Sequence, residues 1–125
     1  MAASPTGRLG LPRSSRLKQR REFAQARARG RRVVCGCLIV NVLRKGADEV
    51  TRLGVVTSRK VGEAVARSRA RRLLRESFRL HQFEIEGPVD LVLVARPSIA
   101  GKKLAEVERD FLGVMAQAGL LKQAG

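Results

Sequence analysis

The segment from residue 63 to residue 79 constrains the fold and the function of this chain more than any other. Its small and apolar side chains recur at helical spacing, which predicts an amphipathic helix with one narrow buried stripe. These residues are Ala66, Ala70, Leu73, Leu74, Ser77 and Phe78. The rest of the predicted helix carries six arginines against two acidic residues. Because like charges on one helix repel one another, the pattern indicates a polyanionic partner, which we interpret as RNA.

The positive charge of the chain is concentrated in two segments. Residues 8–32 hold ten basic residues against one acidic residue, and residues 59–79 hold eight against two. Together they account for the whole formal net charge of +15, so the rest of the chain is close to neutral. The hydrophobic content of 44% is ordinary for a folded protein. Such a concentration of charge is typical of a nucleic-acid-binding surface.

Several other functions are disfavoured by the sequence. No apolar run approaches the roughly 20 residues of a membrane helix, and no apolar core precedes Arg8 as in a secretory signal. We therefore expect a cytoplasmic protein without a membrane partner. Cys35 and Cys37 are badly spaced for a disulfide, and the single histidine, His81, is distant in sequence. We interpret the cysteines as apolar strand residues and His81 as a solvated surface residue, and we predict neither a metal site nor a catalytic group.

Apolar periodicity and turn residues predict a single domain at residues 16–120. Residues 1–15 are expected to form a flexible basic arm and residues 121–125 a short tail. The predicted helices are 16–29, 62–80 and 102–118, and the predicted strands are 33–43, 52–57 and 89–95. With the first strand open to division in two, the order is α-β-β-(β)-α-β-α. This order predicts an α+β fold, a two-layer sandwich with the helices on one face of a small mixed sheet.

Four segments carry a pattern found together in one known family. They are Leu17–Phe23 (LKQRREF), Leu53–Gly62 (LGVVTSRKVG), Ala64–Arg79 (AVARSRARRLLRESFR) and Asp90–Pro97 (DLVLVARP). With the closing amphipathic helix, they cover the chain from about residue 17 to residue 120. On these motifs the chain resembles the protein component of bacterial ribonuclease P.

The resemblance implies a small protein subunit that is not catalytic alone. In that family the catalytic RNA subunit removes the 5′ leader of precursor tRNA by endonucleolytic cleavage, with Mg²⁺ held mainly by the RNA. The protein binds the catalytic RNA and the leader, and one protein is expected per RNA subunit. The implied fold resembles the second domain of ribosomal protein S5, with a left-handed βαβ crossover that departs from the usual right-handed rule.

The resemblance also assigns site residues. Contacts to the catalytic RNA are expected from Arg59, Lys60, Arg67, Ser68, Arg69, Arg71, Arg72 and Arg75. The leader-binding cleft is expected to be lined by Phe23, Arg27 and Asn41. Ser68 replaces the central Asn of the family motif, and Arg27 and Asn41 stand where aromatic residues are expected. We therefore expect a more polar cleft, with fewer of the stacking contacts that contribute about 1–3 kcal/mol per base.

The residues alone leave other binding functions open. A general RNA-binding protein, of the ribosomal or RNA-chaperone type, could use the same basic helix. A double-stranded DNA-binding protein could place that helix in a major groove, although no second helix of a helix-turn-helix motif is evident. A membrane-surface helix is the weakest alternative, because the apolar stripe is partly Ala and Ser.

Overall fold

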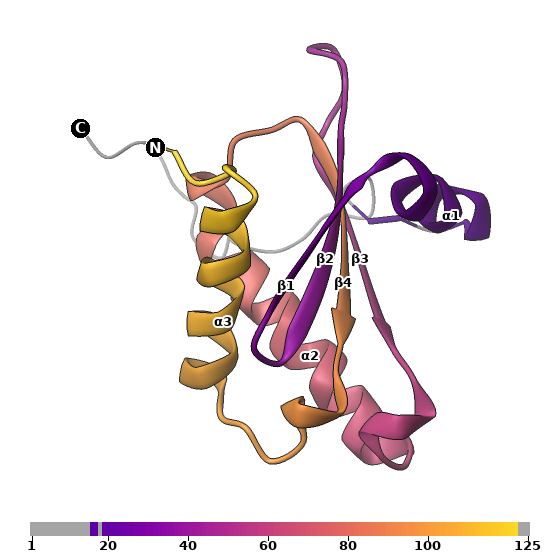
Figure 1. Ribbon diagram of the computed structural model, residues 1–125, viewed down its shortest axis with the longest axis vertical. Coiled ribbons are helices and arrows are strands. Elements are labelled where there is room, and N and C mark those ends of the chain that lie inside the picture. Colours follow the sequence, from indigo (N-terminus) through magenta and orange to yellow (C-terminus); the bar gives the residue numbers. More distant parts are fainter. Residues whose placement is uncertain (1–15, 18, 123–125) are drawn as a thin grey trace.

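The computed structural model describes residues 16–17 and 19–122, which form three α-helices and a four-stranded mixed sheet (Figure 1). The helices are α1 (Arg20–Arg29), α2 (Ala64–His81) and α3 (Leu104–Gln117). The strands are β1 (Arg31–Cys35), β2 (Leu38–Arg44), β3 (Arg52–Thr57) and β4 (Val89–Ala95). Short 3₁₀ helices are η3 (Arg59–Val61), η4 (Gln82–Glu84) and η5 (Pro97–Ile99). The predicted α+β class and element order are confirmed, and the optional extra strand is present.

The sheet has the order β1-β2-β4-β3. β1 and β2 form an antiparallel hairpin, β2 pairs antiparallel with β4, and β3 pairs parallel with β4. Because α2 connects β3 to β4, the predicted βαβ unit is confirmed. The left-handed crossing of this connection stays a prediction of the family resemblance.

The segment predicted as one strand, residues 33–43, is a tight hairpin. Cys35 pairs with Leu38 across a two-residue turn, and Gly36 adopts φ 58°, a conformation that glycine tolerates. Cys37 therefore lies in the turn rather than on the strand of Cys35, and the prediction that both cysteines share one strand was wrong. Val-rich segments on either side hid the turn, because Gly-Cys is a weak turn signal in sequence.

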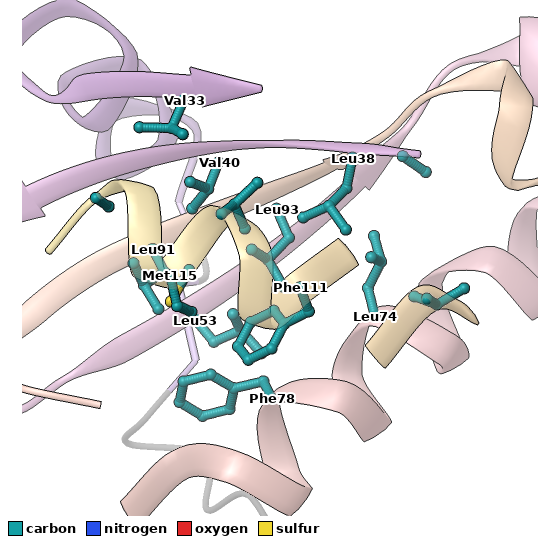
Figure 2. Close-up of a cluster of buried hydrophobic side chains, with 14 of the residues drawn as sticks. Val33, Leu38, Val40, Leu53, Leu74, Phe78, Leu91, Leu93, Phe111 and Met115 are labelled. Atoms are coloured by element: carbon teal, nitrogen blue, oxygen red, sulfur yellow. The ribbon is translucent and has the colours of Figure 1, made fainter. Parts of the chain in front are cut away.

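The main core lies between the sheet and the helices α2 and α3. Alternate strand residues point to this face, including Leu91 and Leu93 of β4, which are both fully buried. Phe78 of α2 meets Phe111 of α3 edge to face, with ring centroids 6.5 Å apart. Figure 2 shows both rings beneath the strand side chains. The apolar stripe predicted for α2 is thus the surface that holds it on the sheet.

The opposite face of the sheet is covered by α1, so the helices do not all lie on one face as predicted (Figure 1). Leu17, Ala26 and Val92 form a second, smaller buried cluster there. The physical reason is that β4 is apolar on both faces, and both must be removed from water. The fold therefore has three layers, with α1 on one side and α2 with α3 on the other.

Buried ion pairs hold α1 to the sheet. Asp90 is only 2% exposed, and it accepts two hydrogen bonds from the guanidinium of Arg52, at 3.0 and 2.9 Å. Arg52 also bonds Glu22 of α1, and Lys45 lies 3.4 Å from the same Asp90 carboxylate. Hydrogen bonding to Asp90, and then the Asp90 charge and the contact with Glu22, raise the pKa of Arg52 above its usual value despite the opposing effect of burial. A buried carboxylate needs such partners, so this network fixes α1 over β3 and β4.

The ends of the chain lie partly outside the described residues. The predicted basic arm, residues 1–15, lies there, as do residues 123–125. Leu121 forms an antiparallel bridge with Ile85, and the backbone N–H of Lys122 donates to the Glu84 carbonyl oxygen at 2.8 Å. Among the described residues, no helix combines the length and apolar character needed to cross a membrane.

Candidate nucleic-acid interface

The outer side of α2 presents the first group of predicted RNA-binding residues. Ser68, Arg69 and Arg72 line a shallow hollow of about 310 Å³ together with Ala64 and Val65. Val65 is 83% exposed, the largest exposed fraction among the large hydrophobic side chains that the structure describes. This surface faces away from the sheet because the residues lie opposite the buried stripe of the helix. It combines positive charge with an apolar spot, which suits both the phosphates and the sugars of RNA.

Two arginines of α2 are held by hydrogen bonds to the fold itself. The Arg71 guanidinium donates to the hydroxyl of Thr57, at the end of β3, at 3.1 Å, and to that of Ser68 at 3.3 Å. The Arg69 guanidinium donates to the carbonyl oxygen of Lys102, just before α3, at 2.6 Å. Arg71 is therefore directed towards β3 and Arg69 towards α3. These bonds orient the two side chains without neutralising their charge.

Carboxylate partners are missing from the predicted RNA-binding residues. Glu76 of α2 pairs with Arg79, to which it is bonded at 2.8 Å, and Arg79 was not among the predicted residues. Within residues 16–17 and 19–122, no salt bridge involves the seven basic residues of the predicted set. They are Arg59, Lys60, Arg67, Arg69, Arg71, Arg72 and Arg75. We call this set, with Ser68, the α2 surface.

Arg59 and Lys60 extend the α2 surface at the start of the helix. Both are exposed in η3, which packs against α2 directly after β3. Their neighbour Val61 is buried and anchors the turn, and Gly62 follows with φ 145°, where a side chain would be strained. Arg59 and Lys60 therefore lie next to the basic helix, as the sequence predicted.

The residues predicted for the leader-binding cleft lie on the other face of the sheet. Phe23 and Arg27 of α1 line a hollow of about 450 Å³ above Val56 of β3, with Arg20 and Ala24 beside them. A second hollow of about 310 Å³ is lined by Arg27, Arg32, Ile39, Asn41 and Val94. Because Arg27 borders both hollows, the fold brings all three predicted residues to one surface. We call the two hollows together the α1 groove.

The α1 groove has an apolar floor and a basic rim. Its floor comes from strand residues, including Val56 and Val94, and Asn41 is 6% exposed and belongs to this floor. Its rim comes from the exposed side chains of Arg20, Arg27 and Arg32. Phe23 is fixed over Gly54, where an added Cβ would lie 2.4 Å from the ring. Such a groove can hold bases on its floor and phosphates at its rim.

Sequence reasoning missed three arginines that line hollows on this face, which are Arg20 and Arg32 in the α1 groove and Arg16 in a neighbouring hollow. The available signal was the excess of nine positive charges over residues 8–32. That charge excess identified the segment as basic, but it did not indicate on which side of the sheet each residue lies. Placement depended on α1 crossing the second face of the sheet, which was not predicted.

His81 is a structural residue, and its prediction as a solvated side chain was wrong. Its ring nitrogens contact carboxylate oxygens of Glu84 and Glu108 at 2.6 and 2.5 Å, and the ring stacks on Phe111. Burial acts to lower the pKa of His81, but the two carboxylates outweigh it and raise that pKa above its usual value. The ring joins the end of α2 to η4 and α3, and when it is protonated it donates to both carboxylates.

Cys35, at the end of β1, and Cys37, in the hairpin turn, are both free thiols. Burial, and then the neighbouring Asp110, raise the pKa of Cys37 to about 12. Asp110 accepts a hydrogen bond from the backbone N–H of Cys37 at 3.0 Å. A protonated, buried thiol is a structural residue rather than a nucleophile. The described residues contain no group of three His, Cys, Asp or Glu side chains that could hold a metal ion.

Comparisons with known proteins identify the relatives of this fold. The family model for ribonuclease P matches residues 11–119. The ribonuclease P protein component of Brevibacillus brevis is 33% identical over 114 residues, covering 91% of this chain and 90% of that protein. That of Desulfovibrio desulfuricans is 40% identical over 108 residues, covering 86% and 79%.

Solved structures agree with the sequence relatives. The RNase P protein of Staphylococcus aureus superposes with a TM-score of 0.78 at 24% identity, covering 86% of this chain and 98% of that one, which shows a shared fold. The RNase P protein of Thermotoga maritima has a TM-score of 0.73 at 26% identity, covering 82% and 96%. The family resemblance drawn from the motifs is confirmed. The chain belongs to the ribonuclease P protein family, the protein component of a tRNA-processing endoribonuclease.

Proposed function

We propose that this protein binds the catalytic RNA of ribonuclease P through the α2 surface and holds the 5′ leader of precursor tRNA in the α1 groove. As the protein component of ribonuclease P, it acts in the 5′ maturation of tRNA together with that RNA. The observation that carries the proposal is the set of seven basic side chains on α2 and η3 without a carboxylate partner among the described residues.

Docking through α2 follows from the nature of its charges. Arginine forks bind phosphates through two parallel hydrogen bonds, which a lysine cannot provide. Arg69 and Arg71 are oriented in advance by bonds to the Lys102 carbonyl and the Thr57 hydroxyl. Less side-chain entropy is therefore lost when these arginines meet RNA. Arg72 and Ser68 lie between them on the outer face and complete a surface for one structured RNA.

Leader binding follows from the construction of the α1 groove. A single strand can place a base against Phe23 and the valine floor while its phosphates meet the rim arginines. The floor is aliphatic apart from Phe23 and Asn41, so the rim should supply a larger share of the affinity than stacking does. Binding should accordingly tolerate many leader sequences.

The ligands for magnesium are better supplied by the RNA than by this protein. Mg²⁺ prefers oxygen ligands, usually with at least one carboxylate. No carboxylate lines the hollows of the α2 surface or the α1 groove described above, and Glu76 and Asp90 are engaged by arginines. When bound, the metal supplies the hydrolytic chemistry from the RNA side. This chain's residues hold and orient the two RNAs and screen the repulsion between them.

The decisive experiment is cleavage of a labelled precursor tRNA by the cognate ribonuclease P RNA at low Mg²⁺, with and without the protein. The proposal expects the protein to lower the Mg²⁺ concentration needed, with saturation at one protein per RNA. A matched measurement of binding to unrelated structured RNAs tests the general RNA-binding alternative. Equal affinity for all RNAs, with no effect on cleavage, would replace the proposal with that alternative.

A further inference from the structure

A fourth hollow lies at the outer edge of β3, where it shares Phe23 with the α1 groove and Arg75 with the α2 surface. It measures about 220 Å³, and its charged lining consists of Arg16 and Arg75. Phe23 and Gly54 form part of its wall. We call this hollow the edge pocket. It is large enough for a phosphodiester group and has more polar than apolar surface, in contrast to the α1 groove.

Backbone pairing holds Arg16 at this edge. Arg16 forms a parallel bridge with Leu53 of β3, and the backbone N–H of Leu17 donates to the Leu53 carbonyl oxygen at 2.9 Å. The buried side chain of Leu17 packs beneath α1 and secures this contact. Arg16 is therefore placed by the sheet, although its side chain is exposed.

The edge pocket concentrates positive charge that no carboxylate offsets. Arg75 reaches it from α2, and Arg71 lies one turn away beside Thr57. Partial burial, and then the charges of Arg16 and Arg71, lower the pKa of Arg75. None of the described residues that line the pocket is acidic. Three arginines drawn together in this way favour an anion, because each gains from a shared negative charge.

The edge pocket is continuous with the α1 groove through a shared residue. Phe23 borders both, with its ring over Gly54. Since Arg27 in turn joins the two halves of the groove, the hollows form one row, from Arg75 at the side of α2 to Arg32 over the far strands. A strand that leaves RNA docked on α2 would meet the edge pocket first.

We propose that Arg16 and Arg75 form a phosphate-binding site for the leader RNA, at the segment between the cleavage site and the α1 groove. This inference rests on the proposed function, because it assumes that α2 docks on the catalytic RNA and that the leader enters the groove. It makes Arg16 a binding residue and gives the leader a direction across the sheet. The catalytic RNA is the other source of such a phosphate, and the experiment separates the two.

The test pairs Arg16→Ala with precursor tRNAs that carry a single neutral methylphosphonate linkage at successive leader positions. With wild-type protein, one or two linkages near the cleavage site should each weaken binding to the assembled enzyme by about tenfold, as expected for a lost charge-assisted hydrogen bond. With Arg16→Ala, the same substitutions should cause no further loss. Additive losses at every position would overturn the site.

A leader-length series fixes the direction and the source of the phosphate. The effect of Arg16→Ala should appear at shorter leaders than the effect of Arg27→Ala, and it should vanish without a leader. Arg109→Ala, which removes an exposed charge on α3, is the control and should not depend on leader length. If Arg16→Ala bound the leaderless substrate or the catalytic RNA alone more weakly than wild type does, the phosphate would belong to the RNA so affected and not to the leader. Either result would overturn the inference.

Failure of this inference can be distinguished from failure of the proposed function. If wild-type protein lowers the Mg²⁺ requirement while Arg16→Ala matches it at every leader length, only the edge-pocket site is wrong. Arg16→Lys adds a further check, because it keeps the charge and loses the fork. It should retain most of the salt dependence but bind more weakly than wild type. Arg16→Lys indistinguishable from Arg16→Ala would contradict a charge-based contact.

Discussion

The α2 surface and the α1 groove are both positively charged but are constructed differently. Most of the α2 surface belongs to one long helix whose opposite stripe is fixed in the main core, so its shape depends mainly on local helical spacing. The α1 groove is assembled from a short helix and all four strands, and its width depends on where α1 lies. A surface on one element survives small shifts of its neighbours, whereas a groove between elements does not.

Loss of the buried ion network should give the largest difference between the two surfaces. Asp90→Asn removes the carboxylate that Arg52 and Lys45 share, and breaking a buried pair costs about 3–5 kcal/mol. We expect a lower free energy of unfolding in urea titration. In the folded fraction, leader affinity should fall more than affinity for the catalytic RNA. Equal losses of both affinities would show that α1 is not positioned by this network.

Arg72→Ala should weaken binding of the catalytic RNA without affecting the fold. Arg72 is exposed and has no salt bridge among the described residues, so the loss should be about 1.5–3 kcal/mol of binding, as for a charge-assisted hydrogen bond. Arg69→Ala should weaken the same binding and also lower stability, because it loses its bond to the Lys102 carbonyl. Filter binding across a salt series should show a steep dependence that becomes shallower in both variants. Unchanged affinity at physiological salt would reject docking through α2.

Phe23→Leu should weaken leader binding and leave the α2 surface unchanged. The leucine keeps most of the apolar packing over Gly54 but removes the ring on which a base can stack. A loss of about 1–2 kcal/mol of leader binding is expected, at the lower part of the range for one stacked base. The comparison is between substrates with and without a leader, and a leaderless substrate should bind equally well to both proteins. An equal loss for both substrates would remove Phe23 from leader binding.

His81→Gln should make the stability of the α2–α3 contact less dependent on pH. Because the folded pKa is raised, the stabilisation by protonated His81 is fully present below its unfolded pKa, about 6.5, and is lost as pH rises through the folded pKa. The contribution should stay within about 1 kcal/mol after solvent screening. Thermal unfolding from pH 5 to pH 9 measures it. A wild-type protein whose stability relative to His81→Gln increased with pH would contradict this sign.

The sequence predicted the α2 surface more fully than the α1 groove, for physical reasons. The positions of Ser68, Arg69 and Arg72 around a helix follow from a period of 3.6 residues, which is a local property. The placement of Phe23 and Asn41 on the same face of the sheet depends on the β1–β2 hairpin and on α1 crossing that face, which are long-range features. The continuous apolar run of β4 indicated a third layer, because a strand that is apolar on both faces must be packed against other elements on both. The hairpin turn at Gly36 was hidden by the valines on either side.

The smallest expected effect concerns Ser68, where the family motif carries Asn. Ser68 is exposed, and its hydroxyl accepts a hydrogen bond from Arg71 at 3.3 Å, a length at which the bond is weak. An Asn side chain also offers an oxygen to Arg71 and adds an N–H donor that can face RNA. Ser68→Asn should therefore leave stability within about 0.5 kcal/mol and leave cleavage at low Mg²⁺ equal or improved. Strong loss of cleavage with normal stability would mean that this protein uses the small hydroxyl for close approach of the RNA. The two surfaces would then differ less than proposed, because RNA binding by the α2 surface would depend on precise shape complementarity, as binding in the α1 groove does.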